Sequence, residues 1–169
     1  MIVDMIFKNI KEEQIDKDSF ETIPMAQTVS MTFHKFTYSN QKCKEKCKLD
    51  LVKDFEFRGD ENSFVFVLFN LFKNSFFYLV NKPDGLIEIS LETGKDTNTL
   101  YFRDNGLGIP EDKLPSIFDN FISYGKSEGT GLGLEFCKRV MVAFGGDIMC
   151  KSEYGKWTEF ILTFPKYIN

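Results

Sequence analysis

The segment that most restricts the possible folds is a glycine run late in the chain, Gly-Thr-Gly-Leu-Gly-Leu at residues 129–134. It leads directly into an amphipathic pattern over Leu132–Phe144, which predicts a helix. A glycine-rich entry to a helix offers free backbone N–H groups and the positive end of the helix dipole, and both attract phosphate. A dinucleotide-binding fingerprint would follow the first strand of a parallel sheet, and a P-loop would need Gly-Lys-Ser/Thr. Since neither condition is met, we expect a phosphate site in a different fold.

A second segment carries two asparagines on one stripe of a long apolar helix. Asp60 is suited to be the N-cap of a helix that we expect from Glu61 to Val80. Asn70 and Asn74 are four residues apart, so they lie on the same face of this helix. A buried amide needs a partner, and Mg²⁺ accepts an amide oxygen together with waters and phosphate oxygens. Hydrogen bonds to neighbouring backbone groups are the simpler use of these amides, and the two asparagines alone leave both alternatives open.

A third segment, Asp-Asn-Gly-Leu-Gly-Ile at residues 104–109, follows an expected strand. At the end of a strand, the Asp104 carboxylate is placed to accept hydrogen bonds in a pocket. Gly106 and Gly108 would let the backbone approach a flat ligand closely. An ordinary acidic turn with two glycines has the same composition, so this motif by itself does not identify a ligand.

The order of the expected elements predicts one α+β domain. We expect a two-layer sandwich in which helices cover one face of a mixed, mostly antiparallel sheet. Residues 1–17 are expected to be the end of an amphipathic helix followed by a linker, which extends over Asp16–Pro24, and residues 18–169 to be the domain itself. The expected helices and strands are Met25–Asn40, Leu49–Val52, Phe55–Phe57, Glu61–Val80, Leu86–Glu92, Thr99–Arg103, Leu132–Phe144, Asp147–Ser152 and Trp157–Phe164.

Composition narrows the class of partner. The formal net charge is −4 and 43% of the residues are hydrophobic, so the chain can bury a core and nucleic acid is not expected as a partner. The 19 phenylalanines are interpreted as core residues. The four cysteines are expected to be reduced thiols in the cytoplasm, since no secretory signal precedes them. No apolar run approaches the roughly 20 residues that span a membrane; a membrane anchor in the parent protein stays open.

Taken together and in this order, the three segments resemble the GHKL ATPase superfamily, and in particular its histidine kinase branch. The resemblance extends from about Asp18 to Pro165. The N box is similar to residues 70–78, the G1 box to 104–109, the F box to 117–121 and the G2 box to 129–134. It implies the Bergerat ATP-binding fold, with ATP and Mg²⁺ as cofactors.

The resemblance also implies roles for individual residues. Asn74 would coordinate Mg²⁺, Asp104 would accept a hydrogen bond from the adenine amino group, and Tyr78 would pack against the nucleotide. Gly108 and Thr158 would reach the adenine through water, and residues 107–130 would form a mobile lid. The full set of nucleotide-binding residues implied is Asn70, Asn74, Tyr78, Asp104, Gly106, Gly108, Ile109, Lys126, Gly129, Thr130, Gly131, Leu132, Gly133, Leu134 and Thr158.

Two departures from the family pattern bear on the chemistry. Hydrolytic members carry a glutamate one helical turn before the metal ligand as the base for water, whereas this chain has Asn70. Slow hydrolysis and phosphoryl transfer to another nucleophile are therefore expected, with Asn70 and Asn74 as the catalytic pair. Many histidine kinases also have Lys or Arg where this chain has Phe77, and Lys73 on the adjacent turn is the alternative cation.

The phosphoacceptor is expected outside this chain. The single histidine, His34, is followed by Lys35, whereas family acceptors are followed by an acidic residue. Residues 1–15 resemble the end of a dimerisation helix, so the expected partners are upstream phosphoacceptor helices, a response regulator and a second copy of the parent protein. A sensor for quorum signals is the narrower expectation. A regulatory nucleotide-binding module without transfer activity and an anti-sigma-type serine kinase remain as alternatives.

Overall fold

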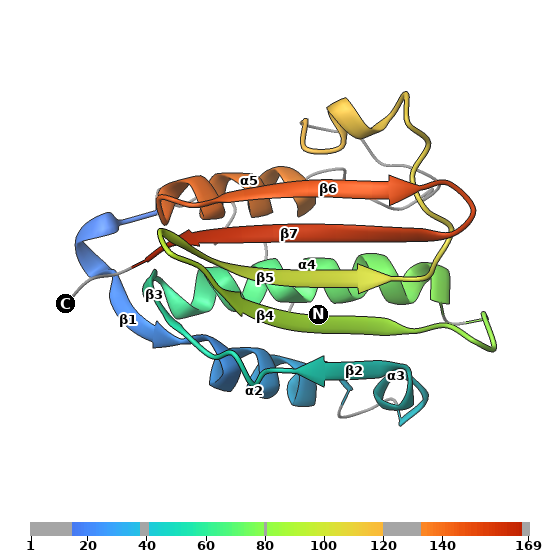
Figure 1. The fold of residues 1–169 in the computed structure, drawn as a ribbon, viewed down its shortest axis with the longest axis horizontal. Coiled ribbons are helices and arrows are strands. Elements are labelled where there is room, and N and C mark those ends of the chain that lie inside the picture. Colours follow the sequence, from blue (N-terminus) through green and yellow to red (C-terminus); the bar gives the residue numbers. More distant parts are fainter. Residues whose placement is uncertain (1–14, 38–40, 80, 120–132, 167–169) are drawn as a thin grey trace, which may run out of the picture.

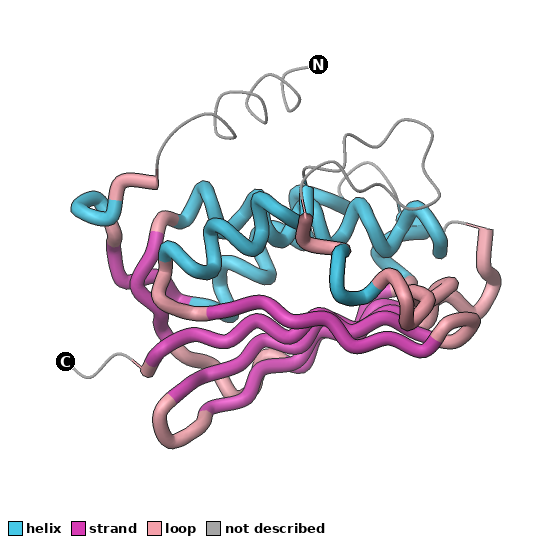
Figure 2. Tube along the Cα trace, turned by 90° about the horizontal axis from the view of Figure 1, so that it is seen from above, coloured by secondary structure: helices cyan, strands magenta, loops and turns pink. Residues whose placement is uncertain are grey.

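The computed structural model describes residues 15–37, 41–79, 81–119 and 133–166, which form two layers (Figure 1). One layer is a five-stranded sheet in the order β2-β4-β5-β7-β6, in which β2 runs parallel to β4 and all other neighbours are antiparallel. Figure 2 shows the helices gathered on one side of this sheet. The predicted α+β sandwich with a mixed, mostly antiparallel sheet is therefore confirmed.

The sheet strands are β2 (Cys47–Asp50), β4 (Ile87–Thr93), β5 (Thr97–Asp104), β6 (Asp147–Glu153) and β7 (Trp157–Pro165). The helices are α2 (Met25–Thr37), α3 (Gln41–Glu45), α4 (Glu61–Leu79) and α5 (Gly133–Ala143), with short 3-10 turns η1 (Lys17–Ser19) and η2 (Leu114–Ser116). Two further strands, β1 (Glu21–Pro24) and β3 (Glu56–Gly59), form a separate antiparallel pair. Among the described residues, no helix is both long and apolar enough to cross a membrane.

The helix that carries both asparagines begins and packs as its sequence predicts. The Ser63 backbone N–H donates to Asp60 Oδ1 at 2.7 Å, which is the expected N-cap bond. Phenylalanine rings fill the layer between this helix and the sheet. The ring centroid of Phe72 lies 5.1 Å from that of Phe102 in β5, and the ring centroid of Phe64 lies 5.6 Å from that of Phe164 in β7. The abundant phenylalanines are thus largely core residues, as expected.

The N-terminal third differs from the sequence prediction. The expected linker Asp16–Pro24 contains β1, which pairs with β3, and α3 was not predicted. Only Ile23 is fully buried in β1, so no alternating pattern marks this strand in the sequence. Gly59 ends β3, and a Cβ there would lie 2.9 Å from the Phe144 ring, so close packing explains the glycine.

Candidate nucleotide site

Asp104 lies at the last position of β5, beside Thr158 of β7 in the sheet register. Its side chain is buried, with 6% of the residue exposed. The Ser75 hydroxyl donates to Asp104 Oδ2 at 2.5 Å, and the Gly106 backbone N–H donates to Oδ1 at 2.9 Å. The carboxylate is therefore held in one orientation at the strand end, where the sequence predicts it.

Two opposing effects act on this carboxyl group. Burial raises the pKa of Asp104 above its ordinary value, since the charged form loses its water. The hydrogen bonds from Ser75 and Gly106, together with the nearby Lys82 cation, lower the same pKa in part. Burial likewise raises the pKa of the Tyr78 hydroxyl, and the Asp104 charge raises it further. Tyr78 thus lies close enough to Asp104 for the carboxylate charge to act on its hydroxyl.

The two glycines of the 104–109 motif each have a steric reason. A Cβ on Gly106 would lie 2.7 Å from Asp104 Oδ1 and 3.5 Å from the Tyr78 Cβ. Gly108 has a φ of +72°, and a Cβ there would lie 2.3 Å from the Glu153 carbonyl oxygen. Glycine at 106 therefore leaves room for the Asp104 carboxylate, and glycine at 108 allows close approach to the backbone of the hairpin.

The loop after Asp104 is attached to the β6–β7 hairpin. The Gly155 backbone N–H donates to the Leu107 carbonyl at 2.6 Å, and the Ile109 N–H donates to Ser152 Oγ at 2.7 Å. The Ser152 hydroxyl donates in turn to the Trp157 carbonyl at 2.6 Å and lies 3.4 Å from Thr158 Oγ1. Ser152 was not predicted; a hydroxyl two residues after the half-buried Cys150, on the same face of β6, was the available signal.

Asn70 and Asn74 are both half-buried on α4. Asn70 Nδ2 donates to the Phe66 carbonyl at 2.9 Å, so this amide uses a backbone partner, the simpler alternative. Asn70 Oδ1 lies where α5 begins, since a Cβ on Gly133 would be 2.6 Å from it. The first asparagine thereby meets the start of the helix that follows the glycine run.

Several predicted site residues lie outside the described part of the chain: Lys126, Gly129, Thr130, Gly131 and Leu132, and with them most of the expected lid. Gly133 and Leu134 begin α5 and are half-buried. Of the expected lid, only residues 107–119 are described, and there Ile117 is buried in the core cluster.

His34 and the cysteines are not gathered into a second site. His34 is exposed on α2, next to Phe33. The four cysteines have free thiols, as expected. Within the described ranges, no group of three or more His, Cys, Asp or Glu side chains is arranged to hold a metal ion.

Comparison with known proteins agrees with this geometry. Residues 59–168 match the family described as histidine kinase-, DNA gyrase B- and HSP90-like ATPases. The chain is 41% identical over 168 residues to the autoinducer 1 sensor kinase/phosphatase LuxN of Vibrio harveyi, covering 99% of this chain and 20% of the relative. It is 37% identical over 165 residues to the CAI-1 autoinducer sensor kinase/phosphatase CqsS of Vibrio cholerae, covering 98% and 24%. The chain thus spans a fifth to a quarter of these relatives.

Solved structures show the same fold. The mycobacterial sensor histidine kinase MprB superposes with a TM-score of 0.73 at 18% identity, covering 88% of this chain and all of the other. The catalytic domain of histidine kinase ThkA superposes with a TM-score of 0.73 at 24% identity, covering 88% and 96%. The fold, the geometry at Asp104 and the family match agree: the chain belongs to the histidine kinase-, DNA gyrase B- and HSP90-like ATPases and is a catalytic, ATP-binding domain of the sensor histidine kinase type.

Proposed function

We propose that this domain binds ATP with Mg²⁺ and transfers the γ-phosphoryl group to a histidine outside the chain. The observation that carries the proposal is Asp104, a buried carboxylate fixed by Ser75 and Gly106 at the end of a central strand. Burying a carboxylate is costly unless it is hydrogen-bonded. A carboxylate in this position can accept a hydrogen bond from a ligand. In nucleotide-binding members of the family, we take that donor to be the 6-amino group of adenine.

The adenine end of the site is formed by the two strand ends and the loop attached to them. Thr158 lies beside Asp104 in the register and is 6% exposed. It would contact the adenine through a bridging water. Gly108 brings the backbone close to the hairpin. Tyr78 is the half-buried ring next to Gly106 and would pack against the nucleotide.

The phosphate end is expected where α4 meets the start of α5. Gly133 and Leu134 begin an 11-residue helix, whose first N–H groups can bind phosphate oxygens. The preceding glycine run and Lys126 would complete this end. Asn74, one turn after Asn70 on α4, would hold Mg²⁺ through one amide oxygen, and the ion would offset phosphate charge.

Transfer is favoured over hydrolysis because no base occupies the position of Asn70. Its amide is neutral and already donates to the Phe66 carbonyl, so it cannot take a proton from water. Catalysis by this chain would then consist of positioning and charge neutralisation.

We extend the proposal to the longer protein of which this domain would be part. LuxN and CqsS are named as autoinducer sensor kinase/phosphatases. By analogy, the parent protein would sense a quorum signal, act as a homodimer with its own phosphoacceptor helices, and pass phosphate to a response regulator from the cytoplasmic side of the inner membrane. His34 is exposed on α2 and is not proposed as the acceptor.

One observation favours the alternative of a regulatory nucleotide-binding module. Phe77 is 50% exposed on α4, at a position where many histidine kinases have a cation. A module of this kind would bind nucleotide but transfer no phosphate.

Calorimetry and a transfer assay test the two steps of the proposal. Asp104→Asn should weaken ADP binding by about 1.5–3 kcal/mol, as expected for one charge-assisted hydrogen bond. Asp18→Asn, which changes an exposed carboxylate outside the expected lid, is the matched control and should bind like the parent chain. Labelled γ-phosphate should move from ATP to an added phosphoacceptor-helix domain of a related kinase. Unchanged ADP affinity in Asp104→Asn would exclude the adenine assignment, and binding without transfer would favour the regulatory module.

A further inference from the structure

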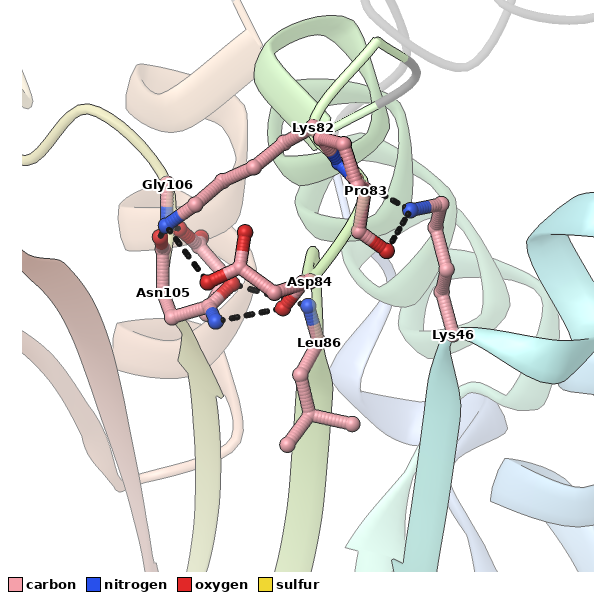
Figure 3. A network of polar contacts seen from close by, with 8 residues as sticks. Lys46, Lys82, Pro83, Asp84, Leu86, Asn105 and Gly106 are labelled. Atoms are coloured by element: carbon pink, nitrogen blue, oxygen red, sulfur yellow. Dashed lines mark hydrogen bonds and ion pairs between the residues drawn. The ribbon is translucent and has the colours of Figure 1, made fainter.

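Asn105, the residue between Asp104 and Gly106, is held by an unusually complete set of hydrogen bonds (Figure 3). Its backbone N–H donates to the Leu86 carbonyl at 3.1 Å, and its side-chain Oδ1 accepts from the Leu86 N–H at 2.8 Å. Its Nδ2 donates to the Asp84 carbonyl at 2.8 Å. The turn between α4 and β4 is thereby bound to the end of β5.

The remaining backbone group of Asn105, its carbonyl, accepts a hydrogen bond from Lys82 Nζ. Lys82 also lies 4.0 Å from the Asp84 carboxylate, and about a third of its side chain is exposed. Figure 3 shows the Lys82 side chain extended across the turn toward Asn105. A side-chain cation thus joins the turn after α4 to the strand end that carries Asp104.

A second lysine, Lys46, holds the backbone of Lys82 in place. Lys46 Nζ donates to the carbonyl of Lys82 and lies 3.4 Å from that of Pro83, so it caps the chain directly after α4. Gly85 fits inside this arrangement, since a Cβ there would lie 3.0 Å from the Lys82 carbonyl oxygen and 3.1 Å from Lys46 Nζ. The position of the Lys82 backbone is therefore set from the β2 side of the sheet.

We propose that Lys82 is a positioning residue for adenine recognition, which it serves by holding the Asn105 carbonyl and hence the orientation of Asp104. The inference rests on the proposed adenine role of Asp104. Asn105 links Asp104, which bonds to Ser75, with Gly106, whose N–H bonds back to Asp104. Loosening Asn105 would let both neighbours shift, and displacement of a binding group by about 1 Å is enough to cost affinity.

The test compares two nucleotides on matched variants. Lys82→Met removes the donor and keeps the aliphatic stem, Lys82→Arg restores a cationic donor, and Lys44→Met changes an exposed lysine on α3 as the control. Each full chain is titrated by calorimetry with ADP and with purine riboside 5′-diphosphate, which lacks the 6-amino group. Lys82→Gln serves as a second variant should Lys82→Met not fold, which thermal unfolding would reveal.

The expected result is a selective loss. Lys82→Met should weaken ADP binding by about fivefold to tenfold and binding of the analogue by less than about twofold. Lys82→Arg should recover most of the ADP affinity, and Lys44→Met should match the parent chain. In an Asp104→Asn background, Lys82→Met should have almost no further effect on ADP binding, since both changes act on one contact.

The outcomes separate this inference from the proposed function. Equal loss for ADP and the analogue, or full additivity with Asp104→Asn, would show a general structural effect and overturn the positioning role. Unchanged ADP affinity in Lys82→Met, combined with a clear loss in Asp104→Asn, would overturn the role of Lys82 alone. Unchanged ADP affinity in Asp104→Asn itself would overturn the adenine assignment.

Discussion

Ser75 of α4 donates its hydroxyl hydrogen to Asp104 Oδ2 of β5 at 2.5 Å, inside the protein. Ser75 follows directly after Asn74, the proposed magnesium ligand. One buried hydrogen bond thus links the helix that would hold the metal to the strand end that would hold the adenine. In the proposed site this contact would align the metal end with the adenine end, and several consequences can be measured.

Ser75→Ala should weaken ADP binding by about threefold to tenfold, the effect of losing one buried hydrogen bond. Because the Ser75 hydroxyl lowers the pKa of Asp104, its removal should raise that pKa. The fall in ADP affinity on acidification should therefore begin at higher pH in the variant than in the parent chain. Calorimetry over a pH series measures both effects. Ser19→Ala, in the exposed turn η1, is the control, and identical pH profiles for Ser75→Ala and the parent would contradict the prediction.

Asp104→Asn should raise the melting temperature of the nucleotide-free chain at neutral pH. Burial raises the pKa of Asp104, so the folded state binds the proton more tightly than the unfolded state does. A carboxyl group of this kind favours folding below its unfolded pKa and loses that contribution as pH rises through the folded value. The advantage of the neutral amide should therefore shrink as pH falls toward the ordinary value of 3.8. A variant that melts below the parent at every pH would refute this expectation.

Gly108→Ala should abolish tight ADP binding, whereas Gly155→Ala should not. Both glycines have positive φ, +72° and +84°, so both alanine variants carry a backbone cost of about 1–2 kcal/mol. Only at Gly108 would the new Cβ meet a carbonyl oxygen, that of Glu153 at 2.3 Å; at Gly155 nothing lies within 4 Å. Urea unfolding should show a loss for both variants, and calorimetry a loss of affinity greater than about tenfold for Gly108→Ala alone. Equal affinities in the two variants would exclude a role for the close approach at Gly108.

Asn74→Ala should remove most of the magnesium dependence of ATP binding, whereas Asn70→Ala should retain it. Asn70 already donates to the Phe66 carbonyl and lies against Gly133, so its loss should change the rate or orientation of transfer more than metal affinity. Each variant, with Asn74→Asp, is titrated with ATP in magnesium and in chelator. Asn74→Ala should bind metal-free nucleotide almost as the parent does. If Asn74→Ala shows the same magnesium dependence as the parent chain, Asn74 is not the magnesium ligand.

The chain should be a poor ATPase, with turnover well below about 1 s⁻¹, the low end for ordinary enzymes. The reason is the amide of Asn70 at the position where a hydrolytic enzyme would need a base. Phosphate release is measured for the parent chain and for Asp104→Asn, which serves as the control for hydrolysis that does not depend on this site. Turnover near 1 s⁻¹ that is lost in Asp104→Asn would contradict transfer as the main reaction.

Local patterns in the sequence determined much of this protein. The cap at Asp60 and the apolar run after it specify α4 within one residue of its observed end, because helix signals are contained in a few consecutive positions. The motif of Asp104, Gly106 and Gly108 is likewise contained in a few consecutive positions, so the sequence shows it directly. Its order relative to the later glycine run indicated the family. Gly108 has the positive φ and the close contact that its place in the motif suggests.

Only the tertiary structure decided which distant segments meet. β1 exists because Glu21–Pro24 pairs with Glu56–Gly59, and its own pattern buries one residue fully, so it has no local signature. Ser75, Ser152 and Lys82 are unremarkable in sequence, and their roles come from Asp104, Ile109 and Asn105, each at least 23 residues away. Periodicity reports which face of an element is buried but not what lies against it. The groups that surround Asp104, the proposed adenine acceptor, were therefore visible only after folding had brought α4, the β6–β7 hairpin and the end of β5 together.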